Sequence, residues 1–271
     1  MPLYSASYGD PERPCIVFLH GMLGNHHDWQ AACRLLGEDY YCVALDLPGH
    51  GHSAHVLPTE NNELTLSDSD GFAFCEQKIR ETLANLGIAR YVLVGYSMGA
   101  RLAMYHACQK PTGLAGVVVE GGHFGLPEAE RSARLANDLA WAARFANEPI
   151  DTVLAAWYQQ AVFADLSAEQ RRDLIAKRID NQGVGIAAMF DAVSLARQPQ
   201  LEVPLTQSQV PVHYVVGERD AKFSALAHQT AFAVSTIPGA GHNAHHEAPQ
   251  AYCLALNAFL TQIPQSLKEW Q

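Results

Sequence analysis

The sequence predicts an α/β fold in which helices flank a mostly parallel sheet and a helical lid is inserted into the chain. Three observations predict it. Short apolar runs alternate with longer amphipathic stretches, the pattern of a parallel sheet covered by helices. Most of these runs end in a glycine, an acid or a histidine, as expected where active-site loops gather at the carboxyl ends of strands. Between about Phe124 and Pro199 the alternation stops and helix-like sequence replaces it.

The apolar runs predict the strands, and one amphipathic stretch between them predicts a helix. Over Phe72–Leu86 apolar residues recur at three- and four-residue spacing, and Gly87 follows as a stop signal. The predicted strands, in order, are Cys15–Leu19, Tyr41–Asp46, Tyr91–Gly95, Gly116–Glu120, Val212–Gly217 and Ala233–Ile237.

The middle of the chain has no strand-like runs and predicts four successive helices. Ser167 and Gln170 have the spacing of a capping box, which marks a helix start. The predicted helices are Glu128–Ala146, Ile150–Phe163, Ser167–Asp180 and Ile186–Ala196. We therefore expect residues 125–198 to form a helical lid, and residues 1–124 and 199–271 to form the sheet-containing core.

Composition and the absence of targeting signals favour a cytoplasmic protein that does not bind nucleic acid. The chain has 271 residues, enough for one large core with an inserted lid, and a net charge of −10 disfavours binding to nucleic acid. No run approaches the ~20 apolar residues of a membrane span, and the N-terminus lacks the pattern of a secretory signal. The six cysteines are scattered without a C-x-x-C pair, which predicts reduced thiols. The oligomeric state stays open.

The segment Gly95-Tyr96-Ser97-Met98-Gly99 predicts a nucleophilic serine. An apolar run leads into it and the helix-like stretch Arg101–Tyr105 follows it. A serine with a glycine two residues to either side suits a sharp strand-to-helix turn, where its hydroxyl is exposed at the tip.

A serine hydroxyl needs a histidine to activate it, and that histidine needs an acid to orient it. Both follow in the chain order Ser, Asp, His. Asp220 lies just beyond a late strand, and His242 lies in the glycine-rich loop after the last strand. Glu218 is the alternative acid, but Asp220 is favoured because it lies further past the strand end.

Main-chain N–H groups near the serine predict a site for developing negative charge. His20-Gly21-Met22 follows the first predicted strand, and the N–H groups of Met22 and Met98 are the expected donors, although a tight turn alone would also explain His20-Gly21. The histidine groups at 50, 52 and 55 and at 242, 245 and 246 lack the H-E-x-x-H spacing and a cysteine set, so no catalytic metal is expected.

With these residues placed, the chain resembles the α/β-hydrolase superfamily over essentially its full length. That superfamily performs many reactions, so the likeness alone specifies fold and triad. Finer motifs resemble the 2-succinyl-6-hydroxy-2,4-cyclohexadiene-1-carboxylate synthases of menaquinone biosynthesis. These motifs are Val117–His123, Trp157–Ala164, Gly217–Phe223 and Gly241–His245.

The second resemblance implies a lyase without a cofactor, which removes a proton from a succinyl-bearing cyclohexene carboxylate and eliminates its enolpyruvyl group as pyruvate. A substrate with several carboxylates needs arginines concentrated inside an acidic protein. The resemblance implies that the carboxylates bind to Arg101, Arg134 and Arg178, and that the pocket is lined by Tyr96, Trp157 and Tyr158. Lys222, two residues beyond the predicted triad acid, is a further candidate for substrate binding. Solvent-exposed helix faces for the lid arginines, and lid packing for Trp157 and Tyr158, are the competing explanations.

Two other functions use the same residues. A carboxylesterase, thioesterase or carbon–carbon bond hydrolase would work through an acyl-enzyme at Ser97, and a binding protein would leave the triad silent. Arginines that converge on the serine would favour the lyase, whereas an apolar pocket would favour an esterase.

Overall fold

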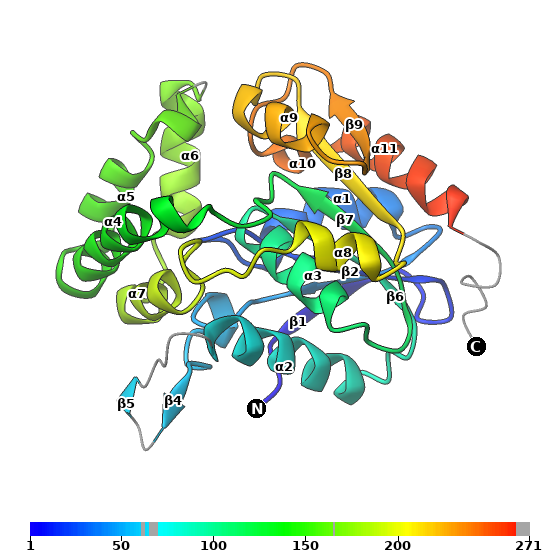
Figure 1. Cartoon of the computed structure of the whole chain (residues 1–271), viewed down its shortest axis with the longest axis horizontal. Helices are drawn as coiled ribbons and strands as arrows, with labels where there is room; N and C mark the ends of the chain where they lie inside the picture. The colour runs from blue at the N-terminus through cyan, green and yellow to red at the C-terminus, as the bar shows by residue number, and fades with distance from the viewer. Residues whose placement is uncertain (61–62, 65–69, 165, 264–271) are drawn as a thin grey trace.

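A computed structural model describes residues 1–60, 63–64, 70–164 and 166–263. Its central sheet has seven strands in the order β1-β3-β2-β6-β7-β8-β9 (Figure 1). β1 pairs antiparallel with β3, and the other neighbouring strands pair in parallel, which confirms the predicted α/β fold. The strands of this sheet are β1 Ser5–Tyr8, β2 Cys15–Leu19, β3 Tyr41–Leu45, β6 Tyr91–Tyr96, β7 Leu114–Glu120, β8 Val212–Gly217 and β9 Ala233–Ile237. A separate pair consists of β4 Thr59–Glu60 and β5 Glu63–Leu64.

The edge strand β1 was not predicted. Its sequence Ser-Ala-Ser-Tyr contains no apolar run, and its residues are partly exposed. Pairing with the buried strand β3, in the register Ser5↔Leu45, makes it a strand. Tertiary contact therefore overrides weak local propensity here.

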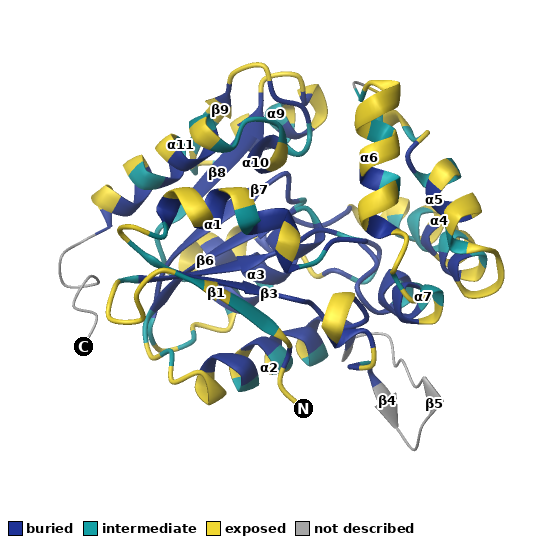
Figure 2. Cartoon of the chain, turned by 180° about the vertical axis from the view of Figure 1, so that it is seen from behind, coloured by how far each residue is buried: buried dark blue, intermediate teal, exposed yellow. Residues whose placement is uncertain are grey.

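Helices cover both faces of the sheet. These are α1 Gln30–Leu36, α2 Asp70–Asn85, α3 Met98–Cys108, α8 Glu202–Gln207, α9 Ala221–His228, α10 Ala244–Glu247 and α11 Pro249–Gln262. Figure 2 shows that the inner strands are buried, whereas the edge strands β1 and β9 are partly exposed and the outer faces of the helices are exposed. The strand β2 is buried along its whole length, as expected when helices cover both faces of a parallel sheet.

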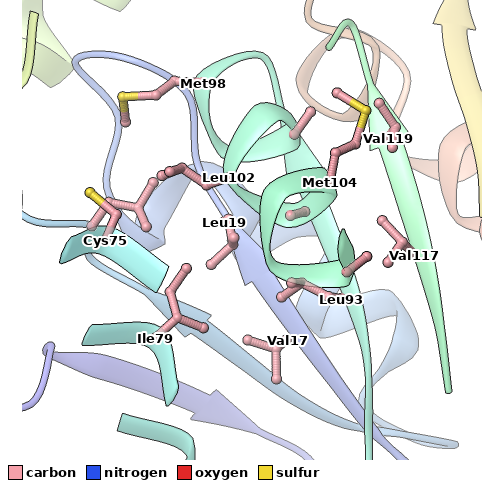
Figure 3. Close-up of a cluster of buried hydrophobic side chains, with 14 of the residues drawn as sticks. Val17, Leu19, Cys75, Ile79, Leu93, Met98, Leu102, Met104, Val117 and Val119 are labelled. Carbon is pink, nitrogen blue, oxygen red and sulfur yellow. The ribbon is translucent and has the colours of Figure 1, made fainter. Parts of the chain in front are cut away.

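Alternate residues of β2 enter different parts of the core. Val17 and Leu19 belong to the apolar cluster under α2 and α3, which Figure 3 shows with Ile79 and Leu102. Phe18 belongs to the cluster that α1 and α11 cover. All six cysteines are free and most are buried, in agreement with the prediction of reduced thiols.

Four helices follow β7 and lie together at one end of the molecule in Figure 1: α4 Glu128–Asn147, α5 Ile150–Trp157, α6 Ala168–Arg178 and α7 Gly183–Ala192. They share an apolar cluster that includes Phe145, Leu154 and Ile186, and that also takes in Leu23 from the loop after β2. The division into a core and a lid at residues 125 and 198 stays a prediction.

The helix expected over Ile150–Phe163 is interrupted. It ends at Trp157, and a separate 3₁₀ turn forms at Ala161–Phe163 (η3). The carbonyl of Tyr158 accepts a hydrogen bond from Nε of Arg171 (2.8 Å). The expected capping box is present, with Ser167 Oγ accepting from Gln170 N (3.1 Å) and Gln170 Oε1 accepting from Ser167 N (2.8 Å).

Candidate active site

Ser97 lies at a sharp turn between β6 and α3. Its φ of 51° is in the left-handed region, where a residue other than glycine is strained. The strain is held by the main chain, because Ser97 N donates to the carbonyl of Glu120 (2.8 Å) and Ser97 O accepts from Arg101 N (3.1 Å). The turn therefore has the geometry predicted for a nucleophile elbow.

The two flanking glycines make this turn possible. A Cβ at Gly95 would overlap the carbonyl of Gly99, and a Cβ at Gly99 would overlap the carbonyl of Leu19. Neither obstacle is a movable side chain, so side chains at both positions would push the turn away from the end of β2.

The acid and the base meet as predicted. His242 Nδ1 lies 2.6 Å from Asp220 Oδ2, and both side chains are largely buried. Glu218, the alternative acid, instead accepts a hydrogen bond from Gly239 N (2.7 Å). Because Asp220 accepts a hydrogen bond from Nδ1–H of His242, Nε2 is the ring nitrogen left to accept a proton.

The loops that carry Asp220 and His242 are tied to each other. Arg219 N donates to Ala240 O (2.9 Å), and Arg219 Nη2 donates to Glu247 Oε2 (2.8 Å). The same carboxylate oxygen accepts from Gly241 N (2.9 Å). These contacts keep the acid and the base in register across the carboxyl ends of β8 and β9.

The expected anion-binding N–H groups are not used in hydrogen bonds within the described part of the chain. Among the described residues, neither Met22 N nor Met98 N has a hydrogen-bond acceptor. Met98 is the first residue of α3, so its N–H also carries the favourable end of the helix dipole. A Cβ at Gly21 would lie 2.7 Å from the Tyr96 ring and 3.5 Å from Cβ of Ser97, so glycine lets this loop approach the serine.

Two buried histidines hold the loop that carries Met22. His20 Nε2 accepts from Leu47 N (2.9 Å), so its Nδ1 donates to Gly21 O (2.7 Å). His50 Nε2 accepts from Leu23 N (3.1 Å) in the same way. Burial lowers the pKa of both imidazoles, that of His50 to about 3, which keeps them neutral and structural.

Two cavities meet at Ser97. The larger has a volume of about 350 Å³ and is lined by Ser97, His242 and residues of the lid helices. The smaller, of about 120 Å³, extends beside α3 and is lined by Arg101 and His123. Their shared lining residues are Met22, Ser97, Arg134, Asp138, Trp157, Lys222 and Phe223.

Arg101 lines the smaller cavity and carries a buried charge without a carboxylate partner among the described residues. Its Nη1 donates to the carbonyl of Val193 (2.7 Å) and, at 3.4 Å, to Oε1 of Gln198. Only 8% of the residue is exposed. Burial and then the charge of Arg134 lower the pKa of the guanidinium below its usual range. An anion in this cavity would compensate that charge.

Arg178 is buried at the larger cavity and is already paired. Its Nη1 lies 2.7 Å from Asp28 Oδ1 and its Nη2 lies 2.8 Å from Asp28 Oδ2, a two-pronged ion pair between α6 and the 3₁₀ turn His26–Trp29 (η1). Burial alone would raise the pKa of Asp28, but Arg178 lowers it on balance. Nε of Arg178 is buried and has no hydrogen-bond partner among the described residues.

The other two cations line both cavities. Arg134 Nε contacts Oδ1 and Oδ2 of Asp138 (2.8 and 2.9 Å), and Asp138 also accepts from Ser194 Oγ (2.7 Å). Lys222 is exposed, and its Nζ lies 5.4 Å from the centre of the Phe223 ring.

The three predicted aromatic residues line the larger cavity. Tyr96 lies between the rings of His242 (5.4 Å) and His245 (5.0 Å). Trp157 packs edge-on against Trp141 (5.0 Å) and also lines the smaller cavity, so it combines lid packing with a place at the site.

Sequence reasoning missed the carboxylates that pair with the lid arginines. Arg134 and Asp138 are four residues apart on one helix, a spacing that could have revealed the pair. Asp28 lies 150 residues from Arg178, and no local signal connects them. The charges of the site are therefore less uniform than the arginine positions alone suggested.

The comparisons agree with this geometry. Residues 16–255 match the model of the alpha/beta hydrolase family. A 2-succinyl-6-hydroxy-2,4-cyclohexadiene-1-carboxylate synthase of Yersinia pseudotuberculosis serotype O:1b is 46% identical over 251 residues, which are 92% of this chain and 88% of that protein. A synthase of the same name from Escherichia coli O1:K1 is 46% identical over 256 residues, 94% of this chain and 97% of that protein.

A solved structure described as MenH from S. aureus aligns with a TM-score of 0.84 at 22% identity, over 96% of this chain and 98% of that one. At that identity the match supports the fold. Within the described residues, no helix has the length and apolar character needed to cross a membrane. The chain belongs to the α/β-hydrolase family and, within it, to the family of 2-succinyl-6-hydroxy-2,4-cyclohexadiene-1-carboxylate synthases.

Proposed function

We propose that this chain is a carbon–oxygen lyase. It eliminates pyruvate from 5-enolpyruvoyl-6-hydroxy-2-succinyl-cyclohex-3-ene-1-carboxylate and forms 2-succinyl-6-hydroxy-2,4-cyclohexadiene-1-carboxylate. The observation that carries this function is the 46% identity to synthases of that product over more than nine-tenths of the chain. A cytoplasmic location accords with the free cysteines.

In the proposed reaction Ser97, Asp220 and His242 form a base relay. Asp220 holds the Nδ1 proton of His242, so Nε2 can accept the Ser97 hydroxyl proton while Ser97 takes the proton from the substrate carbon. The electron pair of the C2–H bond forms the C2–C3 double bond, the pair of the existing C3–C4 double bond moves to C4–C5, and the C5–O bond to the enolpyruvyl group breaks. The leaving enolate regains a proton from His242 and becomes pyruvate, and no acyl-enzyme forms.

Negative charge that develops on the succinyl carbonyl oxygen would be stabilised by Met22 N–H and Met98 N–H. Neither donor has an acceptor in the part of the chain that the structure describes, so both can meet this charge without rearrangement. Removing one such donor from an enzyme of this type costs roughly 3–4 kcal/mol of transition-state stabilisation.

The carboxylates of the substrate would be bound by Arg101, Arg134, Arg178 and Lys222, with Tyr96, Trp157 and Tyr158 as apolar walls. Arg101 has the largest expected share, because the other two arginines already contact a carboxylate of the protein. A polyanionic substrate therefore spans both cavities, with its reacting carbon at Ser97.

The test is a coupled assay of pyruvate release from the enolpyruvyl substrate, read through lactate dehydrogenase, with a nitrophenyl ester measured in parallel. The lyase predicts fast pyruvate release and feeble ester cleavage. Efficient ester turnover without pyruvate would contradict it and leave a hydrolase that works through an acyl-enzyme.

A further inference from the structure

His123 follows β7 and lines the smaller cavity together with Ser97, Arg101 and Lys222. Its Nδ1 accepts a hydrogen bond from the N–H of Gly125 (3.1 Å). A neutral imidazole carries a single N–H, so this contact places the proton on Nε2. Among the described residues Nε2 has no hydrogen-bond partner. His123 therefore presents an unused donor at a cavity that is also lined by Arg101, a cation that makes no direct contact with a carboxylate among the described residues.

A buried glutamine joins His123 to Arg101. Nε2 of Gln198 donates to the carbonyl of His123 (2.6 Å), and Oε1 of the same amide accepts from Arg101 (3.4 Å). Gln198 is fully buried, so the two residues are held beside each other from one side. Their placement does not depend on a flexible surface contact.

We propose that His123 is a substrate-binding residue whose Nε2–H donates a hydrogen bond to the substrate carboxylate that Arg101 holds in the smaller cavity. The proposal rests on the function proposed above, because that function supplies a substrate with several carboxylates. It adds a neutral donor to a set of contacts that was otherwise made of cations.

A neutral donor suits this position. The charged groups around His123 are Arg101 on α3, Arg134 and Asp138 on α4, and Lys222 on α9. Burial first, and then the charges of Lys222, Arg101 and Arg134, lower the pKa of His123 to about 4. A fourth cation would repel the other three in the empty site, whereas a neutral N–H can bind a carboxylate without that cost.

Two substitutions separate binding from local structure. His123→Asn places an oxygen near the position of Nδ1, where it can still accept from Gly125 N–H, but it removes the donor at Nε2. His123→Gln places an amide N–H near the position of Nε2 but removes the acceptor at Nδ1. A purely structural histidine would thus tolerate Asn better than Gln, and a binding histidine the reverse.

The experiment measures the KM for pyruvate release and, separately, the dissociation constant of succinate, followed by tryptophan fluorescence because Trp157 lines both cavities. We expect His123→Asn to raise the KM and the dissociation constant of succinate about tenfold each, the equivalent of ~1.4 kcal/mol. Both constants of His123→Gln should stay within about threefold of the wild-type values. The succinate titration needs no turnover, so it decides on His123 even if the wild type releases no pyruvate.

The proposal is overturned if His123→Asn binds succinate like the wild type, or if His123→Gln is as weak as His123→Asn. It is also overturned if the wild type shows no binding of succinate, because the smaller cavity would then not be a carboxylate site. Failure of the proposed function has a different signature, which is an absence of pyruvate release with succinate binding intact.

Discussion

Arg101 and Arg178 are both almost fully buried at the wall of the site, yet their surroundings are opposite. Arg178 forms a two-pronged ion pair with Asp28, which connects the lid helix α6 to the loop after β2. Arg101 has only a carbonyl and an amide oxygen as acceptors. The difference teaches that Arg178 chiefly holds the protein together, whereas the charge of Arg101 contacts no carboxylate among the described residues and is the one that we propose a ligand meets.

The largest expected effect tests the assumption that both cavities serve one reacting centre at Ser97. Ser97→Ala should lower kcat for pyruvate release by about 10³-fold, because the base relay loses the group that takes the substrate proton. The dissociation constant of succinate should stay within about twofold of the wild type. Unchanged pyruvate release would show that Ser97 takes no part in the reaction. The point where the two cavities meet would then not be the reacting centre.

Removing the paired arginine should act mainly on stability. Arg178→Met leaves Asp28 buried without its partner, which is expected to lower the free energy of unfolding by about 3–5 kcal/mol. Urea denaturation measures it. Arg144→Met is the matched control, since Arg144 also lies on a lid helix and pairs with Glu148, but at the surface. Equal stability of the Arg178 variant and this control would contradict the structural role of Arg178.

The pH dependence of the stability lost in Arg178→Met sharpens the comparison. We call this loss, the free energy of unfolding of the wild type minus that of the variant, the stability deficit. In the wild type Arg178 keeps the pKa of Asp28 low, so the carboxylate stays ionised and its contribution is lost only as pH falls below the ordinary range of aspartate. In Arg178→Met burial is opposed only by the smaller influence of His20 and His245, so we expect the folded-state pKa of Asp28 to rise above the unfolded value. Protonation then favours folding, so the deficit should narrow between pH 7 and pH 5. A constant or growing deficit would show that Asp28 is not the group left uncompensated.

Removing the unpaired arginine should act mainly on catalysis. Arg101→Met takes away a charge-assisted contact to the substrate, and we expect kcat/KM to fall about 10²-fold, or ~2.7 kcal/mol. Stability should stay within about 1 kcal/mol of the wild type, because the lost hydrogen bonds are offset by relief of a buried charge. Steady-state kinetics and urea denaturation of the same preparation check both. The contrast fails if Arg101→Met unfolds as readily as Arg178→Met.

The smallest effect is expected at Lys222, which is exposed and therefore screened. Lys222→Met should raise KM roughly threefold at low ionic strength, and the difference from the wild type should shrink as salt is added. A salt titration of KM for both proteins measures this. A loss as large as that of Arg101→Met would mean that Lys222, and not Arg101, carries the main contact.

Much of the fold was readable in the sequence because its signals are local. Five-residue runs such as Cys15–Leu19 are buried on both faces and therefore continuously apolar. The strand Ser5–Tyr8 lacked that signal because it lies at the sheet edge and depends on pairing with β3. The helix expected to continue to Phe163 ends at Trp157. There Arg171 on α6 donates a hydrogen bond to the carbonyl of Tyr158, a contact that no local sequence pattern encodes.

The site likewise divides into features that local sequence signals predicted and features that depend on tertiary contacts. The contact between Asp220 and His242, expected from their chain order and loop positions, is present. The ion pair of Asp28 and Arg178 was not predictable, since the two residues meet only through the fold, whereas the four-residue spacing of Arg134 and Asp138 could have revealed theirs. His123 lies inside a motif used for the family resemblance. Its proposed role depends on which ring nitrogen carries the proton, and only the hydrogen bond from Gly125 N–H to Nδ1 shows this.

The measurement that tests the central claim most directly is rapid quenching of the wild-type enzyme with the enolpyruvyl substrate, followed by intact mass and pyruvate analysis at each time point. The base-relay account predicts that pyruvate accumulates from the first turnover while the mass of the protein never changes. A substrate-derived adduct on Ser97 that forms and decays at the rate of turnover would contradict it and establish covalent catalysis by an acyl-enzyme.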